Sequence, residues 1–346
     1  MRILLDILHP KHVHFFRPLI TRWLRRGDAV FIVTRDKDIT HQLLDTYGFP
    51  YVCISKQERS YRLAGELVKR WYRILDQLLE FSPDITLSVG GISTAMPAKL
   101  LGIPNIILTD TETASLSNAL AFPFADRILT PAWYRKEIGP QQVRYRGFHE
   151  WSYLHPAEFT PDPQIVWAEG INPEEPYALV RLVRWDAVHD LGETGLGEFA
   201  TVELVKRLAD RMRVYISSET ALPEPLQPFL ATFNVSRIHH ILAYARLLVG
   251  ESPSMGTEAA LLGVPSVIIS SWAGRCGNMQ VLEQQYGLMR VYQHHQEALE
   301  AVFELADRGW LFEAFQAKRT VLVRDLECIP DVVDRQIEQV LDAAYD

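Results

Sequence analysis

The chain has 346 residues, of which 48% are apolar and 23% are charged, and its formal net charge at pH 7 is −8. This composition is typical of a soluble globular protein with room for two domains, and the acidic charge argues against nucleic acid as the main partner. No segment approaches the roughly 18 unbroken apolar residues of a membrane span. Three scattered cysteines without metal-ligand spacing predict a reducing cytoplasm rather than a disulfide framework.

The first 135 or so residues alternate short apolar runs with helical patterns. The runs predicted as strands are RILLDIL, AVFIVT, YVCI, ITLSVGG, NIILTD and DRILTP. The helix predicted after the first strand ends at Gly27, and its apolar face carries Phe16, Leu19, Ile20 and Leu24. Unbroken apolar strands joined by helices indicate a parallel sheet that is covered on both faces.

A stretch rich in proline and acidic residues, 155–177, breaks this alternation and marks the predicted domain boundary. The strands predicted after it are YALVRLV, RVYISSE, RLLVGES and SVIIS. We therefore expect an α/β protein with two doubly wound Rossmann-type domains, over residues 1–160 and 161–330, that face each other across a cleft. An amphipathic C-terminal helix, over residues 331–346, is expected to cross back to the first domain.

Residues 245–270 read as a strand, a loop of small residues, a helix starting near Thr257, and another strand. Such a loop points backbone N–H groups, hydroxyls and the positive end of the helix at an anion, and phosphate fits best. Glu258 in the first turn could accept hydrogen bonds from ribose hydroxyls. The alternative is an ordinary strand-to-helix turn, in which serine caps the helix and glutamate favours its dipole.

The same stretch resembles the nucleotide-sugar-binding signature of GT-B glycosyltransferases and of UDP-N-acetylglucosamine 2-epimerase: serine, small residues, Glu-Ala, an apolar helix and Gly-x-Pro. The resemblance implies a GT-B-like fold and a nucleotide sugar, most of all a UDP sugar, as substrate, with no required cofactor. It implies that Arg184 binds the diphosphate. The alternative is that Arg184 is an ordinary cation at the protein surface. The other implied nucleotide-sugar contacts are Ser252, Ser254, Met255, Gly256, Thr257, Glu258, Asn278 and Gln280. Pro253-Ser254 replaces the Gly-Gly of the epimerases.

Residues 87–114 resemble the strand-loop-helix-strand block of the epimerase. The epimerase's catalytic aspartate falls on Gly91 and its histidine on Val183, so two expected acid–base groups are absent. Glu112 matches a third carboxylate, or Asp110 replaces it in role. Gly90 and Gly91 are closer to the acceptor-side loop of the lipid-linked N-acetylglucosaminyltransferase of cell-wall synthesis. The alternative for the paired glycines is a tight turn.

The stretch DILHPKHVHFF places His9, His12 and His14 within six positions after the first strand. No metal is expected there, because residues 9–14 hold three histidines on one loop with no i,i+4 histidine pair and no carboxylate among them. We interpret the histidines as an uncharged wall of the acceptor site, with His9, His14, Asp110 and Glu112 as candidates for the catalytic base. A histidine that caps the helix or packs in the core is the alternative.

The whole chain is similar to an uncharacterised GT-B-like family of archaea and bacteria, whose members begin with DI-x-HPxHVHFF and continue with TRDKD. The leading hypothesis is a sugar-nucleotide-dependent glycosyltransferase of surface glycan or glycolipid synthesis, with a glycan or lipid-linked acceptor. The alternatives are a UDP-sugar 2-epimerase or hydrolase and a non-catalytic nucleotide-sugar-binding protein. The basic, aromatic segment of residues 59–73 suggests peripheral contact with an anionic membrane, or else a core helix with a solvated basic face.

Overall fold

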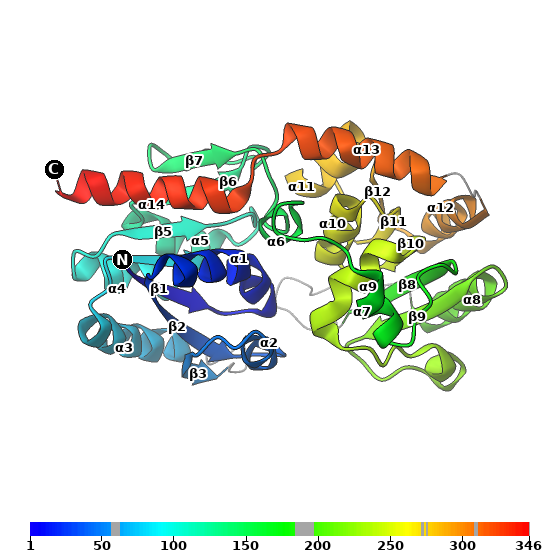
Figure 1. Cartoon of the computed structure of the whole chain (residues 1–346), viewed down its shortest axis with the longest axis horizontal. Coiled ribbons are helices and arrows are strands. Elements are labelled where there is room, and N and C mark those ends of the chain that lie inside the picture. Colours follow the sequence, from blue (N-terminus) through cyan, green and yellow to red (C-terminus); the bar gives the residue numbers. More distant parts are fainter. Residues whose placement is uncertain (57–62, 184–196, 271–272, 275, 308–310, 346) are drawn as a thin grey trace. The chain divides into compact units, whose positions relative to one another are not determined.

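The computed structural model describes residues 1–56, 63–183, 197–270, 273–274, 276–307 and 311–345. The chain divides into two compact units (Figure 1). The first unit comprises Met1–Glu158 and Glu327–Asp346, and the second comprises Phe159–Leu326. Each unit contains a parallel sheet with flanking helices, as the alternation of apolar runs and helical patterns predicts.

The first unit is built on a seven-stranded sheet in the order β3-β2-β1-β4-β5-β6-β7. Every neighbouring pair of these strands is parallel. The strands are β1 Arg2–Ile7, β2 Ala29–Asp36, β3 Val52–Lys56, β4 Ile85–Val89, β5 Asn105–Leu108, β6 Arg127–Pro131 and β7 Gln142–Tyr145. The chain starts in the middle of the sheet, builds outward to β3 and then returns to the other side of β1, so the strand order reverses between β1 and β4.

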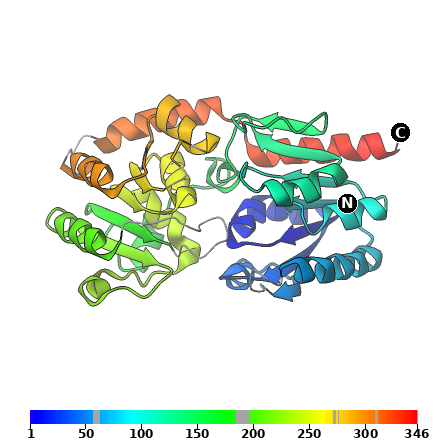
Figure 2. The same ribbon diagram turned by 180° about the vertical axis from the view of Figure 1, so that it is seen from behind.

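Helices cover both faces of this sheet. They are α1 Pro10–Arg26, α2 Thr40–Thr46, α3 Leu63–Phe81, α4 Ala95–Leu100, α5 Ser115–Ala121, α6 Trp151–Leu154 and α14 Ile329–Tyr345. Helices α3 and α4 lie side by side and share a core with β1 to β3, which includes Leu4, Val33 and Ile74 (Figures 1 and 2). Because both faces are covered, five of the six side chains of β1 are buried.

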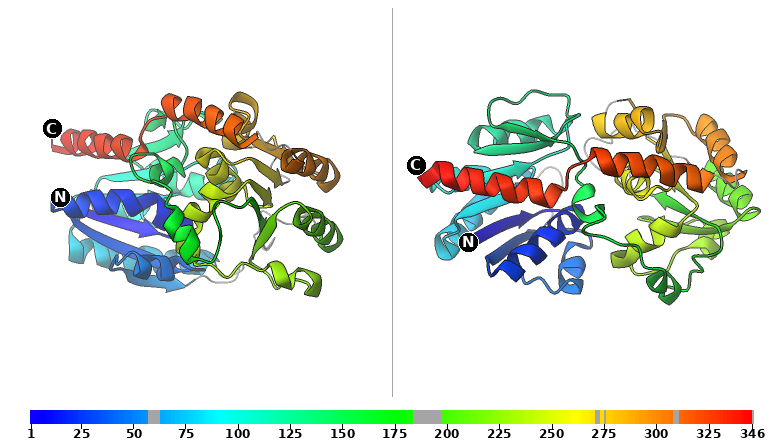
Figure 3. Two further views of the ribbon diagram at one scale, coloured as in Figure 1. Left: turned by 45° about the vertical axis from the view of Figure 1, so that its right-hand side comes forward. Right: turned by 45° about the horizontal axis from the view of Figure 1, so that its top comes forward.

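The C-terminal helix α14 belongs to the first unit, as expected, and lies along it in red in Figure 3. Its Asp334 accepts a hydrogen bond of 2.7 Å from the indole N–H of Trp23 on α1. This contact corrects the predicted apolar face of α1, because Trp23 is fully buried whereas Leu24 is 48% exposed. The predicted end of the helix is confirmed, since Gly27 adopts a left-handed conformation with φ +86°.

The second unit has a five-stranded parallel sheet in the order β12-β11-β10-β8-β9. Its strands are β8 Tyr177–Leu182, β9 Arg213–Ser218, β10 Leu247–Gly250, β11 Ser266–Ile269 and β12 Met289–Tyr292. Its helices are α7 Pro163–Ala168, α8 Glu198–Ala209, α9 Ile238–Tyr244, α10 Pro253–Leu262, α11 Gly277–Gln280, α12 His295–Asp307 and α13 Leu311–Asp325. The strand order reverses between β8 and β10.

Residues 63–73 of the basic segment lie in α3, and this part is less of a cationic surface than the sequence suggests. Arg70 is 3% exposed and forms an ion pair with the fully buried Asp6, while it also donates to the backbone carbonyl of Thr34 at 3.0 Å. Arg59 and Arg62 lie outside the described residues. No helix in the described part of the chain is long and apolar enough to cross a membrane.

Candidate functional site

The carboxyl ends of β1 and β4 bring two of the predicted loops together in the first unit. His9 follows β1, and Gly90 and Gly91 follow β4, on the two sides of the point where the strand order reverses. Doubly wound sheets bind ligands at the carboxyl edge at such a point. The topology therefore places the histidine motif and the paired glycines where a ligand site is expected.

His9 and His12 are held at the start of α1 by backbone hydrogen bonds. His9 is the N-cap of the helix, and its Nδ1 accepts the amide proton of Lys11 at 3.1 Å. His12 Nδ1 accepts the amide proton of Leu8 at 3.3 Å. Because each Nδ1 is an acceptor, each neutral ring carries its proton on Nε2 and is a hydrogen-bond donor there.

The pKa values of both rings keep them neutral at physiological pH. Burial, followed by the charges of Lys37 and Lys11, lowers the pKa of His9 to about 3. Burial also lowers the pKa of His12 well below its ordinary value, and His9, His149 and Lys11 add to the effect. Both rings are therefore neutral and can donate a hydrogen bond from Nε2 to an oxygen of a ligand.

A buried charge cluster lies directly beside these rings. Lys11 Nζ is 2.9 Å from Asp110 Oδ2 and 2.9 Å from Glu150 Oε1. Burial opposes its charge, but the two carboxylates outweigh burial and raise the pKa of Lys11. Burial alone would raise the pKa of Asp110, yet His149 and Lys11 hold that pKa below its ordinary value. For Glu150 burial dominates over Lys11, so the pKa of its carboxyl is raised.

His149 completes this cluster on the side of α6. Its Nδ1 is 3.6 Å from Asp110 Oδ2, and its ring packs against Phe15. The ring is 1% exposed, and burial lowers its pKa to about 4 against the opposing effect of Asp110. The Nε2 of His149 and the Oε2 of Glu150 are both buried, and neither has a hydrogen-bond partner among the described residues. Unpaired polar atoms of this kind are costly in a folded protein and are common at functional sites.

Two of the predicted candidates for the base lie away from this cluster. His14 is 8% exposed and packs between Tyr47 and Tyr153, with its Nδ1 3.4 Å from the Tyr47 hydroxyl. Glu112 accepts a hydrogen bond of 2.7 Å from the amide of Arg135 and so fixes the loop after β6. The structure thus brings together His9, His12 and Asp110, and leaves His14 in the core.

Lys11, His149 and Glu150 were not predicted as site residues from the sequence. Lys11 lies inside the histidine motif, and its position between two histidines was a usable signal. His149 and Glu150 follow β7, an edge strand that was not predicted because its sequence mixes polar and apolar residues. A histidine–glutamate pair directly after a strand is a pattern that would have pointed to them.

The second unit places its predicted loop at the corresponding reversal, between β8 and β10. Gly250 ends β10, and a Cβ there would lie 2.2 Å from the carbonyl oxygen of Arg181, so only glycine fits. Glu251 is 5% exposed and accepts a hydrogen bond of 3.1 Å from the amide of Val183. Arg184, the predicted diphosphate ligand, lies outside the described residues.

Helix α10 begins at Pro253 rather than near Thr257, the predicted start. Ser252 is its N-cap, and the Ser252 hydroxyl accepts the amide proton of Met255 at 3.3 Å. Pro253 has no N–H group, so Ser254 supplies the first amide at the positive end of the helix. The serine cap of the alternative interpretation and an amide-lined anion site are both compatible with this geometry.

Gly256, Thr257 and Glu258 of the predicted loop are buried in the second unit, whereas Met255 is half-buried. Glu258 is 8% exposed, and its Oε1 lies 3.1 Å from Nε2 of the buried His239. The Thr257 hydroxyl donates to the carbonyl of Pro253 at 3.1 Å. A Cβ at Gly256 would lie 2.5 Å from Ile268, so this glycine allows α10 to approach β11 closely.

Asn278 and Gln280, the predicted sugar contacts, both lie on the short helix α11. Asn278 is 9% exposed, whereas Gln280 is half-buried. Within the described residues, no group of three or more histidine, cysteine, aspartate or glutamate side chains is arranged to hold a metal ion.

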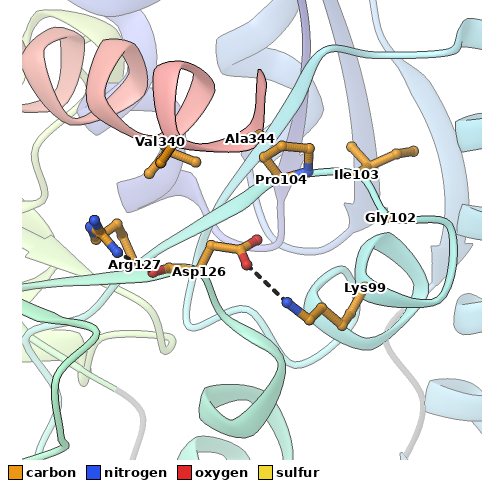
Figure 4. A pocket seen from close by; sticks show the side chains of 9 residues that line it. Lys99, Gly102, Ile103, Pro104, Asp126, Arg127, Val340 and Ala344 are labelled. Atoms are coloured by element: carbon orange, nitrogen blue, oxygen red, sulfur yellow. Dashed lines mark hydrogen bonds and ion pairs between the residues drawn. The ribbon is translucent and has the colours of Figure 1, made fainter. Parts of the chain in front are cut away.

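A separate pocket of about 290 Å³ lies at the opposite, amino end of the first sheet (Figure 4). The end of α14 contributes Val340 and Ala344, and an ion pair of 3.0 Å between Lys99 and Asp126 lies at its edge. None of the predicted site residues lines this pocket. The carboxyl edges of the two sheets therefore remain the candidate sites.

Comparison with protein families and curated proteins gives two matches. Residues 1–172 match the model of a family described as "Protein of unknown function (DUF354)". "Uncharacterized protein MJ0665" of Methanocaldococcus jannaschii is 22% identical over 276 residues, which make up 76% of this chain and 80% of that protein.

Solved structures resemble the chain over nearly its whole length. "S. aureus MnaA-UDP co-structure" has a TM-score of 0.73 at 13% identity, covering 99% of this chain and 97% of its own. UDP-GlcNAc 2-epimerase from Neisseria meningitidis bound to UDP-GlcNAc has a TM-score of 0.67 at 12% identity, covering 99% and 100%. The glycosyltransferase SsfS6 of Streptomyces sp. SF2575 has a TM-score of 0.60 at 14% identity, covering 96% and 99%. These similarities confirm the predicted GT-B-like fold of two Rossmann-like α/β domains.

Proposed function

We propose that the protein is a glycosyltransferase that moves a sugar from a UDP sugar to a glycan or lipid-linked acceptor. The second unit binds the donor and the first unit binds the acceptor. Support comes from the shared fold of proteins that are described with UDP or UDP-GlcNAc bound and of a named glycosyltransferase. Surface glycan or glycolipid synthesis is the process that such an acceptor would serve.

The donor site of this proposal is the amino end of α10. The first amide of the helix, from Ser254, and the Ser254 hydroxyl contact the diphosphate, with Arg184 as its cationic partner. As the bond between the sugar and the diphosphate breaks, the leaving group gains negative charge. Fixed dipoles and a guanidinium stabilise that charge electrostatically, so the reaction needs no metal ion.

The lack of space around Gly91 is the observation that favours a transferase over an epimerase. The resemblance to the epimerases places a catalytic aspartate at this position. Gly91 has φ +67°, and a Cβ on it would lie 2.4 Å from Cδ1 of Ile107. A carboxylate side chain has no room there, so a proton abstraction that depends on it is not available to this chain.

The acceptor site of the proposal is the edge of the first sheet next to β1. His9 and His12 donate hydrogen bonds from Nε2 to acceptor oxygens, and Asp110 takes the proton of the attacking hydroxyl. The acceptor oxygen then bonds to the anomeric carbon of the sugar, and UDP leaves with the electron pair of the broken bond. Lys11 holds Asp110 ionised and in place, as its ion pair of 2.9 Å indicates.

Ligand binding is the first test. A panel of UDP, thymidine, guanosine and cytidine diphosphate sugars is added to the protein, and the midpoint of thermal unfolding is measured for each. A ligand that binds only the folded state raises this midpoint. We expect UDP-GlcNAc or another UDP sugar to raise it, and a smaller rise in Ser254→Ala.

Turnover is the second test. UDP release from the donor that binds is measured with and without glycan and lipid-linked acceptors, in wild-type protein and in Asp110→Asn. The proposal expects release that depends on an acceptor and on Asp110. Absence of a thermal shift with all of these nucleotide sugars, or release with free 2-epimerised sugar and no acceptor, would contradict it.

A further inference from the structure

A pocket of about 380 Å³ opens in the first unit between α3 and α5, beside the candidate acceptor loops. Its volume lies within the usual range for small-molecule sites, roughly 300 to 1,000 Å³. Leu8, directly after β1, and Ile92, after β4, both line it. Each is the direct neighbour in sequence of a candidate acceptor residue, His9 and Gly91 respectively. The pocket and the candidate acceptor site are thus built from the same two loops.

The walls of the pocket are aliphatic. Leu67 comes from α3, and Leu116 and Leu120 come from one face of α5, four residues apart. Leu116 is 76% exposed and Leu120 is 39% exposed, which is costly for side chains that have no partner. In the described part of the chain no aromatic ring lines the pocket, and a flat base or a stacked sugar has no ring to lie against.

The polar end of the pocket carries two guanidinium groups and the carboxylate of Glu66. Arg35, from the end of β2, is 19% exposed and is paired with Glu66 through a contact of 2.7 Å from Nη2. Arg70 is buried against Asp6. Within the part of the chain that the structure describes, the Nε atoms of both arginines are buried and have no hydrogen-bond partner. Guanidinium groups recognise phosphates and carboxylates, so an anionic head group fits this end.

We propose that this pocket binds the aliphatic chain of an amphiphilic acceptor, with an anionic head group at Arg35. The inference rests on the proposed glycosyltransferase function and narrows its acceptor from any glycan to a lipid-like molecule. The aliphatic walls hold the chain, and the shared loops place the head group next to His9 and Gly91. A lipid phosphate and a fatty acid both have this chemistry.

The test measures the binding of n-decyl phosphate, decanoate and n-decanol, each below its critical micelle concentration, by equilibrium dialysis with the full chain. The double variant Leu116→Ser/Leu120→Ser removes the α5 wall. Its matched control is Leu100→Ser/Leu101→Ser, because these neighbouring leucines are 68% and 37% exposed and lie outside the pocket. All four substituted side chains are partly or largely exposed, so both variants should fold.

We expect saturable binding, with a Kd that rises about tenfold or more in the α5 variant and stays unchanged in the control. Tighter binding of decyl phosphate than of decanoate indicates a lipid phosphate, and the reverse indicates a fatty acid. In Arg35→Gln the two anionic probes should weaken while decanol changes little. The proposal fails if no probe binds saturably, if decanol binds as tightly as both anionic probes, or if the α5 variant and its control weaken equally.

The thermal-shift panel with UDP sugars separates this failure from a failure of the proposed function. A UDP-sugar shift without probe binding overturns the amphiphilic acceptor and leaves the transferase proposal intact. Probe binding that depends on Leu116 and Leu120 without any nucleotide-sugar shift supports the amphiphile site and overturns its role as an acceptor site.

Discussion

Replacing Lys11 by methionine removes the cation that Asp110 and Glu150 share, and it tests the charge cluster directly. The Lys11 ammonium is 2.9 Å from an oxygen of each carboxylate, and the side chains of Lys11, Asp110 and Glu150 are only 25%, 11% and 2% exposed. Breaking a buried ion pair by removing one partner costs about 3–5 kcal/mol, because an uncompensated charge remains. We expect Lys11→Met to lower the free energy of unfolding at pH 7 by roughly this amount.

The loss of unfolding free energy in Lys11→Met should depend on pH. In the wild type, the depressed pKa of Asp110 stabilises the fold above the unfolded pKa of about 3.9, and this is lost as the pH falls through the folded value. Without Lys11, the folded pKa values of Asp110 and Glu150 both rise. The variant is then destabilised most at high pH and recovers as its carboxylates take up protons. The difference between the two proteins should shrink as the pH falls from 8 to about 4.

The assay is denaturant unfolding of the full chain at several pH values in that range. Lys99→Met is the matched control, because Lys99 forms an ion pair of 3.0 Å with Asp126 at side-chain exposures of 54% and 30%. A surface pair of this kind contributes about 0–1 kcal/mol. Equal losses in the two variants, or a loss in Lys11→Met that does not change with pH, would show that Lys11 does not neutralise the two buried carboxylates.

Three further comparisons use the same unfolding assay. Gly91→Ala should lower the free energy of unfolding by about 2–4 kcal/mol, since φ is +67° and the new Cβ meets a core side chain. Gly90→Ala, with φ +83° and open space around it, should lower it by about 1 kcal/mol, and equal losses would contradict this difference. Ser252→Ala should lower the free energy of unfolding by about 1 kcal/mol, because it removes the N-cap of α10. Ser254→Ala should leave this free energy unchanged and weaken UDP-sugar binding about tenfold. Arg70→Met should cost about 3–5 kcal/mol, and a loss below 1 kcal/mol would place Arg70 at the surface.

The fold was predictable because both sheets are parallel and buried, so most of their strands are unbroken apolar runs in the sequence. Strands β7 (QVRY) and β12 (MRVY) lie at sheet edges, so polar residues enter them and hide the pattern. Leu24 and Trp23 show a second limit. Helical periodicity gave the buried face of α1 approximately, but only the contact with α14 decides which of these neighbours is covered.

The site was predictable where its residues are local in sequence. Ser252 as a cap and His9 at a strand end follow from short patterns that the structure retains. Lys11 and Asp110 are 99 residues apart, and their pairing depends on β1 and β5 both ending at the same edge of the sheet. The sequence pattern also could not predict the direction in which a side chain points. Glu258 is an example, because it points into the second unit and contacts His239 there.

A glycosyltransferase moves the sugar and does not exchange the proton at C2 of that sugar, whereas a 2-epimerase does. The most direct test is ¹H NMR of UDP-GlcNAc incubated with the protein in D₂O, first without and then with a lipid-linked acceptor. We expect the C2 proton signal to keep its intensity in both samples and UDP to appear only with the acceptor. Loss of the C2 proton signal by exchange with deuterium, with or without release of UDP, would contradict the account.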